Sequence, residues 1–295
     1  MSDTVGSVDA LWRFPVKSMQ GEQLEETELT DHGFVGDRAY ALIDGETGKV
    51  VSAKSVKLFP DLLGCRATFL EPPETSGDVP PVRITLPDGS SVTSDAAGSD
   101  DTLSRFFGRG VRLATAAPED FTIDQYHPDL EDLDPAGYRD TLVEQKLGSA
   151  FFAEAGAPSP VPVGAFFDLF PISVLTTSTL ARLNELRPES RIDARRFRMN
   201  VIVDAEQEGF AENDWIGRGL ELGDAVRLRM AIPDPRCVMT TLAQEDLPKD
   251  TEILRTLTQH NRLQVGDGGK YPCAGAYAVV EETGTLRTAD AVVLR

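Results

Sequence analysis

Residues 233–241 read PDPRCVMTT and place Cys237, one of three cysteines in the chain, in a stretch stiffened by two prolines. A thiolate is both a nucleophile and a metal ligand, and an adjacent cation such as Arg236 favours it over the thiol. A residue just past the end of a strand is also where scaffolds commonly present functional groups. The residues alone leave two interpretations open: a reactive or metal-binding thiol, or a buried structural cysteine.

Basic and hydroxyl side chains stand at two predicted loop–strand junctions near the N-terminus. Lys17 and Ser18 end the stretch RFPVKS, and Arg38 directly precedes the strand-like run AYALID. Such groups suit an anionic, oxygen-rich ligand such as a phosphate, because charge-assisted hydrogen bonds are among the stronger ones. The alternative is ordinary surface charge.

A third candidate element is RFRMN, which contains Arg198 and Asn200. They alternate with Met199 at the expected start of a strand, so we expect both side chains to point to one side of it. An arginine and an amide together can bind a phosphate and the edge of a heterocycle.

Other templates for catalysis or metal binding fail. The cysteines are odd in number and widely spaced, and no CxxC pair occurs, which disfavours a disulfide framework or structural zinc site. We expect Cys65 to lie in the core and Cys273 to be partly exposed, and assign neither a role. The three histidines are isolated, and Walker, GxGxxG, HExxH and GxSxG motifs are missing.

Composition limits the partners and the compartment. The net charge of −19 disfavours nucleic acid and anionic membranes as partners. There is no apolar run of 18 residues and no signal-peptide pattern at the N-terminus, so a cytoplasmic protein is expected.

Charge is also unevenly distributed along the chain. Acidic residues crowd 119–140, whereas six arginines fall within 182–198. The arginines form either a solvated helix face or a local anion site.

The elements that would position these residues are mostly strands. A hairpin is expected over 38–53, two further strands over 82–93, and another strand over 111–115. Between them, a short helix with an Asp N-cap should end at Gly108. In the last third, strands are expected at 198–204, 220–233, 275–280 and 291–295.

Two helices accompany the later strands. One is expected over 176–187, with Thr176, Thr177 or Ser178 as its N-cap, and one over 250–261, capped by Asp250. The strand that turns at Gly223-Asp224 should bury alternate apolar residues, end at Pro233 and deliver the chain to the cysteine turn.

These patterns predict an α+β, β-rich fold with closed or nearly closed sheet. We place one domain at 4–118 and a second, with flanking helices, at 166–295. An acidic, proline-rich connection at 119–165 joins them. Part of that connection could form an ordered lid over a site.

The succession FPVKS, GFVGDRAYALID, FRMNVIVD, LELGD and PRCVMTT resembles the MOSC family, named after the C-terminal domain of molybdenum cofactor sulfurase. The resemblance covers nearly the whole chain. It implies a MOSC β-barrel preceded by the family's N-terminal β-barrel domain, and a molybdenum cofactor (Mo-molybdopterin) whose pterin carries a phosphate. Met199 stands where the family usually has a proline.

The resemblance also implies roles for individual residues. Cys237 matches the family's cysteine ligand of molybdenum and is the expected catalytic position. A soft thiolate is a reasonable ligand for a metal already bound to dithiolene sulfur. The remaining residues match cofactor contacts of the family: Lys17, Ser18, Arg38, Thr176, Thr177, Ser178, Arg198, Asn200 and Arg236.

The activity implied by the resemblance is a molybdenum-dependent oxidoreductase that reduces small N-hydroxylated or N-oxygenated compounds. Electrons are expected from a separate donor protein of flavin, haem or ferredoxin type, and pyridoxal phosphate is not expected as a cofactor. The alternative is a carrier that passes sulfur, as a persulfide on Cys237, or molybdenum cofactor to a partner. A plain binding module of the same fold is a third possibility.

Overall fold

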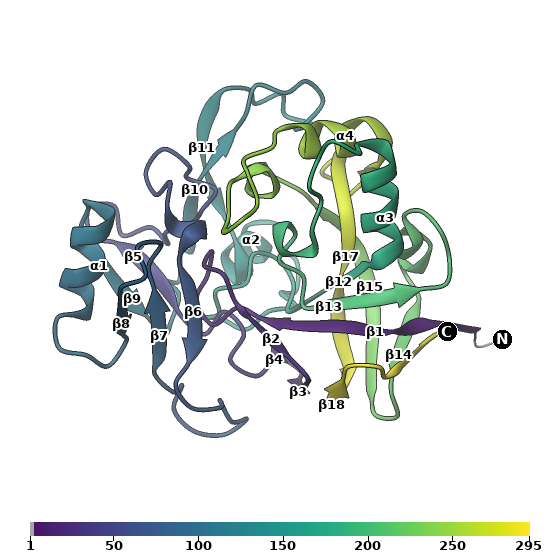
Figure 1. The fold of residues 1–295 in the computed structure, drawn as a ribbon, viewed down its shortest axis with the longest axis horizontal. Coiled ribbons are helices and arrows are strands. Elements are labelled where there is room, and N and C mark those ends of the chain that lie inside the picture. Colours follow the sequence, from purple (N-terminus) through teal and green to yellow (C-terminus); the bar gives the residue numbers. More distant parts are fainter. Residues whose placement is uncertain (1–2) are drawn as a thin grey trace.

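The computed structural model describes residues 3–295 and is built around a closed, mixed β-barrel (Figure 1). Seven strands form the ring, in the order β12 (Ile172–Thr176), β13 (Val201–Ala205), β1 (Asp3–Arg13), β19 (Ala291–Leu294), β14 (Gly219–Leu222), β15 (Val226–Pro235) and β17 (Lys270–Glu282). Pairing of β17 with β12 closes it, and only β12 and β13 run parallel. The expected β-rich α+β architecture is confirmed.

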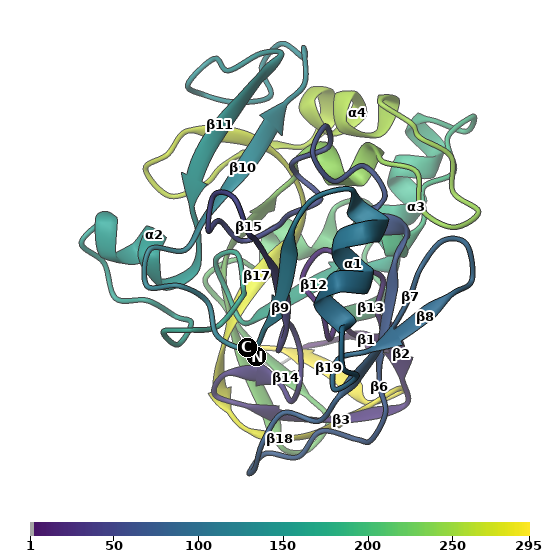
Figure 2. The ribbon, with the colours of Figure 1, turned by 90° about the vertical axis from the view of Figure 1, so that its left-hand side faces the viewer.

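The first strand, although it begins the chain, belongs to this barrel. β1 pairs with β13 on one side and with β19 on the other, so the described termini lie side by side (Figures 1 and 2). Two short strands extend the ring: β2 (Glu22–Leu24) pairs with β1, and β16 (Arg262–Gln264) pairs with β17. The domain boundaries expected from composition remain a prediction.

Alternating apolar residues explain the barrel core. Along β15, Val226, Leu228 and Met230 are buried and the intervening Arg227 and Arg229 are exposed, as predicted. They pack in a cluster that includes the fully buried Trp215.

The predicted end of β15 at Pro233 is wrong. The strand continues to Pro235, because a register shift between Pro233 and Pro235 in its pairing with β17 accommodates two residues without an N–H donor. The chain still reaches Cys237 directly after this strand.

Three smaller sheets accompany the barrel: the first two contribute to a second core cluster in the N-terminal region, and the third packs into the barrel core (Figure 1). One sheet has β6 (Arg66–Phe69), β7 (Val82–Thr85) and β8 (Ser91–Thr93), another has β5 (Ala41–Asp44) and β9 (Val111–Ala114), and a third has β18 (Gly284–Arg287), β3 (Glu26–Thr30) and β4 (Gly33–Phe34). The expected hairpin over 38–53 is reduced to β5 and a single bridge from Ile43 to Val50.

Helix α1 (Ser99–Phe107) ends at Gly108 as predicted, but its N-cap is Gly98 in a left-handed conformation. The expected Asp cap is wrong, because Asp100 instead accepts the backbone N–H of Leu113 at 2.8 Å. That bond ties the helix to β9 rather than to its own first turn.

Two helices flank the barrel, α3 (Thr177–Leu186) and α4 (Glu252–His260). Thr176 caps α3 by accepting the N–H of Thr179, which confirms one of the three predicted caps. Asp250 accepts the N–H of Glu252 at 2.9 Å, although Thr251 occupies the N-cap position of α4. Single 3₁₀ turns complete the element list: η1 (Leu62–Gly64), η2 (Ala194–Arg196), η3 (Ala211–Trp215) and η4 (Val238–Thr241).

The acidic middle segment is ordered rather than a bare linker. It forms the hairpin of β10 (Thr122–His127) and β11 (Thr141–Lys146), followed by α2 (Gly148–Glu154). Figures 1 and 2 show the hairpin projecting beyond the sheets. Within residues 3–295, every helix is too short or too polar to cross a membrane.

Candidate functional site

One cavity of about 980 Å³ is lined by the N-terminal region, the middle segment and the barrel. Seven of the ten residues predicted for the site line it: Lys17, Ser18, Arg38, Arg198, Asn200, Arg236 and Cys237. The fold therefore brings these distant elements together around one cavity. Their individual roles remain predictions.

The other three predicted residues lie elsewhere, at the junction of β12 and α3. Thr176 is fully buried and its hydroxyl donates to Glu212 at 2.5 Å, while Thr177 donates to Asp204 at 2.8 Å. Ser178 contacts the Thr176 hydroxyl at 2.9 Å. These groups serve the helix start and a buried carboxylate, and none lines the cavity among the described residues.

Cys237 is half-buried, lines the cavity and directly precedes η4 as its N-cap residue. Its carbonyl accepts the hydroxyl of Thr240 at 3.1 Å, which fixes the turn. The adjacent Arg236 is bound elsewhere: its guanidinium pairs with Asp234 and donates to the carbonyls of Ala274 and Phe197 at 2.8 and 2.9 Å.

Lys54 is the cavity lysine whose pKa the Cys237 side chain influences. Burial would lower the pKa of Lys54, but Asp168 and then Cys237 outweigh burial and raise it. Lys54 was missed in the sequence because VSAKSV has no pattern that distinguishes it from a surface lysine.

Asp168 links two lysines on the cavity wall. It pairs with Lys17, which also donates to the carbonyl of Phe166 at 2.9 Å, and with Lys54 at 2.7 Å. Burial would raise the pKa of Asp168, but the two ammonium groups overcome it and hold the pKa below its usual range. Its one sequence signal is a lone acid within the apolar run AFFDLF.

Two of the cavity cations carry a burial cost. Burial lowers the pKa of Lys17 to about 8 against the attraction of Asp168. Burial, assisted by the nearby Arg38, lowers the pKa of Arg198 to about 9. Both cations would therefore gain from an anionic ligand in the cavity.

Arg198 forms no ion pair with a carboxylate of residues 3–295, and other contacts hold its side chain. It donates to the carbonyl of Met19 and lies over the ring of Phe14, 4.3 Å from the centroid. Arg38 pairs with Asp37, whose carboxylate also accepts Asn200 at 2.8 Å. This side of the cavity is therefore a connected cluster.

Three residues of this cluster have left-handed backbone conformations. The φ angles are +65° at Ser18, +51° at Arg38 and +55° at Arg198. Non-glycine residues in this region are strained, and such strain concentrates at functional sites. Arg198 and Asn200 accordingly precede β13, which starts at Val201, rather than lying within it.

Asp234 is another carboxylate of the cavity wall, and its pKa is shifted in the opposite direction from that of Asp168. Burial raises its pKa to about 6, although Arg236 opposes the shift. It shares the wall with Tyr277 of β17, whose hydroxyl pKa is raised well above its ordinary value by burial and then by Asp234.

Residues of the middle segment line the cavity, and their action as a lid stays a prediction. His127 at the end of β10 lines it, is 2% exposed and lies with Nδ1 3.4 Å from Asp134. Burial lowers the pKa of His127 against the attraction of Asp134. The isolated histidine of the sequence thus belongs to the middle segment.

The six arginines between 182 and 198 do not act as one anion site. Four pair with acidic side chains: Arg182, Arg187, Arg191 and Arg195. Only Arg196 and Arg198 line the cavity.

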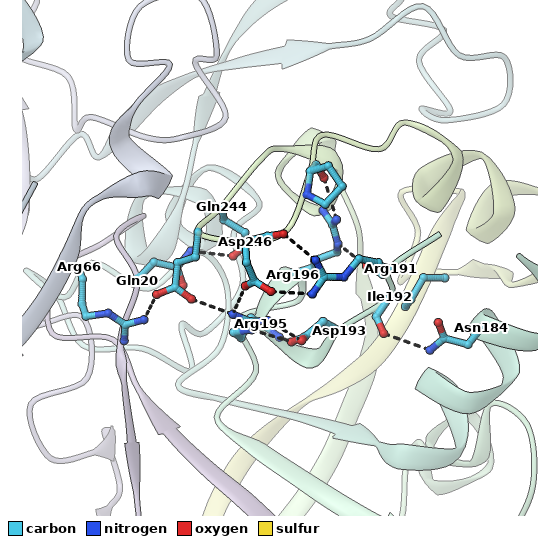
Figure 3. Close-up of polar contacts among 12 residues, drawn as sticks. Gln20, Arg66, Asn184, Arg191, Ile192, Asp193, Arg195, Arg196, Gln244 and Asp246 are labelled. Carbon is cyan, nitrogen blue, oxygen red and sulfur yellow. Dashed lines mark hydrogen bonds and ion pairs between the residues drawn. The ribbon is translucent and has the colours of Figure 1, made fainter. Parts of the chain in front are cut away.

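Arg196 fastens the segment that follows Cys237 (Figure 3). Its guanidinium donates to the carbonyls of Arg191 and Pro248, both at 2.8 Å, and to those of Leu242 and Thr240 at 3.2 and 3.4 Å. The same segment meets the N-terminal region through Gln20, which donates to Gln244 at 2.7 Å.

The remaining cysteines are structural. Cys65 and Cys273 are buried, and burial raises the pKa of each to about 12. The expectation that Cys273 is partly exposed is wrong, because it lies in β17 rather than in a loop. Within residues 3–295, no group of three or more His, Cys, Asp or Glu side chains is arranged to hold a metal ion.

Comparisons with known proteins agree with the layout. The family model of the MOSC N-terminal beta barrel domain matches residues 5–114, and that of the MOSC domain matches residues 164–293. Mitochondrial amidoxime-reducing component 1 of Homo sapiens is 26% identical over 305 residues, covering 98% of this chain and 83% of that protein. Mitochondrial amidoxime reducing component 2 of Rattus norvegicus is 26% identical over 307 residues, with the same coverage.

Among solved structures, the YuaD protein from Bacillus subtilis is similar with a TM-score of 0.43 and 11% identity, covering 100% of this chain and 97% of that one. A likeness at this level adds nothing to the comparison of sequences.

Proposed function

This chain belongs to the MOSC family, and on that premise we propose that it is a molybdenum-cofactor-dependent oxidoreductase that reduces N-hydroxylated compounds. Distant full-length similarity to amidoxime-reducing components supports this choice of substrate. The observation that carries the proposal is one cavity that holds a half-buried thiol together with buried cations.

The residues fit a cofactor with an anionic end. Lys17 and Arg198 are buried cations whose pKa values are lowered, so a phosphate placed beside them would recover much of their desolvation cost. Ser18 and Arg38 stand next to them on the same wall. The single accessible thiol, Cys237, suits a metal that receives its other sulfur ligands from a dithiolene.

Each group then has a defined task. Cys237 would ligate molybdenum, and the Lys17, Ser18, Arg38, Arg198 and Asn200 cluster would bind the pterin and its phosphate. Arg236 would brace the cysteine turn through its carbonyl contacts rather than touch the ligand.

The cofactor would supply two-electron chemistry at the metal. In the reaction, the N–O bond of the substrate breaks, two electrons and two protons are consumed, and the oxygen leaves as water. The electrons come from a separate donor protein of flavin, haem or ferredoxin type. Lys54, which its pairing with Asp168 keeps protonated, would hold a proton in the cavity for the reacting group, while Asp168 stays ionised.

Purified protein tests the proposal. Molybdenum and pterin near one per chain, with reduction of benzamidoxime by a chemically reduced viologen dye, would support it. A sulfur releasable by cyanide, with no molybdenum and no reduction, would instead establish the persulfide carrier. Cofactor without turnover on any N-hydroxylated compound would indicate a cofactor carrier or a binding module.

A further inference from the structure

Four aromatic rings form a continuous row along one wall of the cavity. This aromatic row consists of Phe151 and Phe152 of α2, Phe170 before β12, and Tyr277 of β17, and all four line the cavity. Successive ring centroids are 5.2, 6.0 and 5.3 Å apart. The first two pairs are edge-to-face, whereas Phe170 and Tyr277 are stacked with an interplanar angle of 22°.

Core packing does not account for the aromatic row. Within residues 3–295, the four hydrophobic clusters and the apolar residues packed against them include none of these rings. Phe151 is 41% exposed, and the other three are partly exposed. Apolar rings left partly open inside a cavity favour an apolar ligand there, because burying them is the main gain available.

The inner end of the row meets the charged part of the site. Tyr277 pairs in the barrel with Ser173 and Ile232, and both of these residues also line the cavity. Asp234 and Asp168 both raise the pKa of the Tyr277 hydroxyl, and all three residues line the cavity, so this end of the row lies near two carboxylates. The row therefore runs from the exposed rim at α2 to the charged interior.

We infer that the aromatic row selects substrates, by stacking a flat aryl or heteroaryl ring while the N-hydroxylated group reaches the Cys237 end of the cavity. The inference rests on the proposed reductase function for the reacting group. Ring faces bind other rings in offset-stacked or edge-to-face geometry, and such pairs are stabilised beyond the area they bury. A small aliphatic group of the same reactivity would leave the rings in water.

Paired substrates and a matched ring substitution test the inference with the cofactor-loaded protein. Benzamidoxime and acetamidoxime carry the same reacting group on a phenyl ring or a methyl group. In Phe170→Leu, the KM for benzamidoxime should rise roughly 3- to 10-fold, with kcat and the KM for acetamidoxime little changed. Phe106→Leu alters a ring outside the cavity, edge-to-face with Phe107 at 4.8 Å, and should leave the KM for each amidoxime unchanged.

Tyr277 provides a test by conservative replacement. Tyr277→Phe keeps the ring and should retain the preference for benzamidoxime, whereas Tyr277→Leu should lose it. The inference would be overturned if the ratio of the KM for benzamidoxime to the KM for acetamidoxime were the same in wild type, Phe170→Leu and Tyr277→Leu.

Binding of unreactive products separates this inference from the proposed reaction. Calorimetry should show benzamidine binding more tightly than acetamidine, and Phe170→Leu should reduce that preference. If neither amidoxime is reduced but benzamidine keeps its preference, the aromatic row stands and the reductase function fails. If both amidoximes are reduced but benzamidine binds no better than acetamidine, the reductase stands and the aromatic row is refuted.

Discussion

Replacing Arg196 by methionine should destabilise the protein strongly, although no ligand contact is needed to explain the effect. The side chain is 1% exposed and donates to four backbone carbonyls, two of them at 2.8 Å. Methionine fills similar space and offers no donor, so these carbonyls lose their partners.

The expected size follows from the two short bonds. Hydrogen bonds to a charged group contribute about 1.5–3 kcal/mol each, so the pair accounts for roughly 3–6 kcal/mol. Burial lowers the pKa of Arg196, which shows that holding the cation inside costs free energy and offsets part of this gain. We expect a net loss of about 2–4 kcal/mol, or a melting temperature lower by roughly 4–8 °C.

Arg191, five residues earlier, is the matched control (Figure 3). It pairs with Asp246 at 2.6 Å, but both side chains are 56% exposed. Exposed pairs contribute little, so Arg191→Met should shift the melting temperature by about 1 °C or less. Differential scanning calorimetry of both variants measures the contrast, and equal shifts would refute the assignment of Arg196 as the fastening of the Cys237 segment.

Three further predictions concern charge and backbone. Affinity of the cofactor-free protein for inorganic phosphate should fall as pH rises through 8, because the Lys17 pKa of about 8 must rise on binding; titration calorimetry giving a flat profile from pH 7 to 9 would contradict this. Because the Asp168 pKa is depressed, its stabilisation is present above about pH 4 and lost below, so urea midpoints of wild type and Asp168→Asn should converge on acidification; a constant gap would contradict it. Gly275→Ala should lower the free energy of unfolding by about 2–4 kcal/mol, since φ is +80° and a Cβ would lie 2.7 Å from the Val174 carbonyl oxygen. Gly266→Ala is the control: φ is +50° but the space around it is open, so thermal unfolding should show a loss of only about 1 kcal/mol.

Local patterns in the sequence were sufficient for the strand that leads to the cysteine turn. Alternation of apolar residues predicted the buried face of β15, and the prolines marked its end within two residues. The strand passes Pro233 because a register shift between Pro233 and Pro235 in its pairing with β17 tolerates the missing donor, and pairing partners are not readable from one strand.

Cavity-lining residues were predicted where two polar residues share a short motif, as in RFPVKS and RFRMN. Cavity-lining residues that stand alone in the sequence were missed. Lys54 and Asp168 gain their significance from meeting across more than a hundred residues of chain, which no local pattern reports. Thr176 was predicted to contact the cofactor but does not line the cavity. Its hydroxyl instead accepts the N–H of Thr179 and donates to the buried Glu212.

Cys237 carries the central claim, and metal content tests it most directly. Molybdenum per chain should be measured by plasma mass spectrometry in wild type, Cys237→Ala and Cys65→Ala, each purified from the same molybdate-supplied host. We expect near-stoichiometric molybdenum in wild type and Cys65→Ala, and a loss of most of it in Cys237→Ala. Undiminished molybdenum in Cys237→Ala would contradict the assignment of this thiol as the metal ligand.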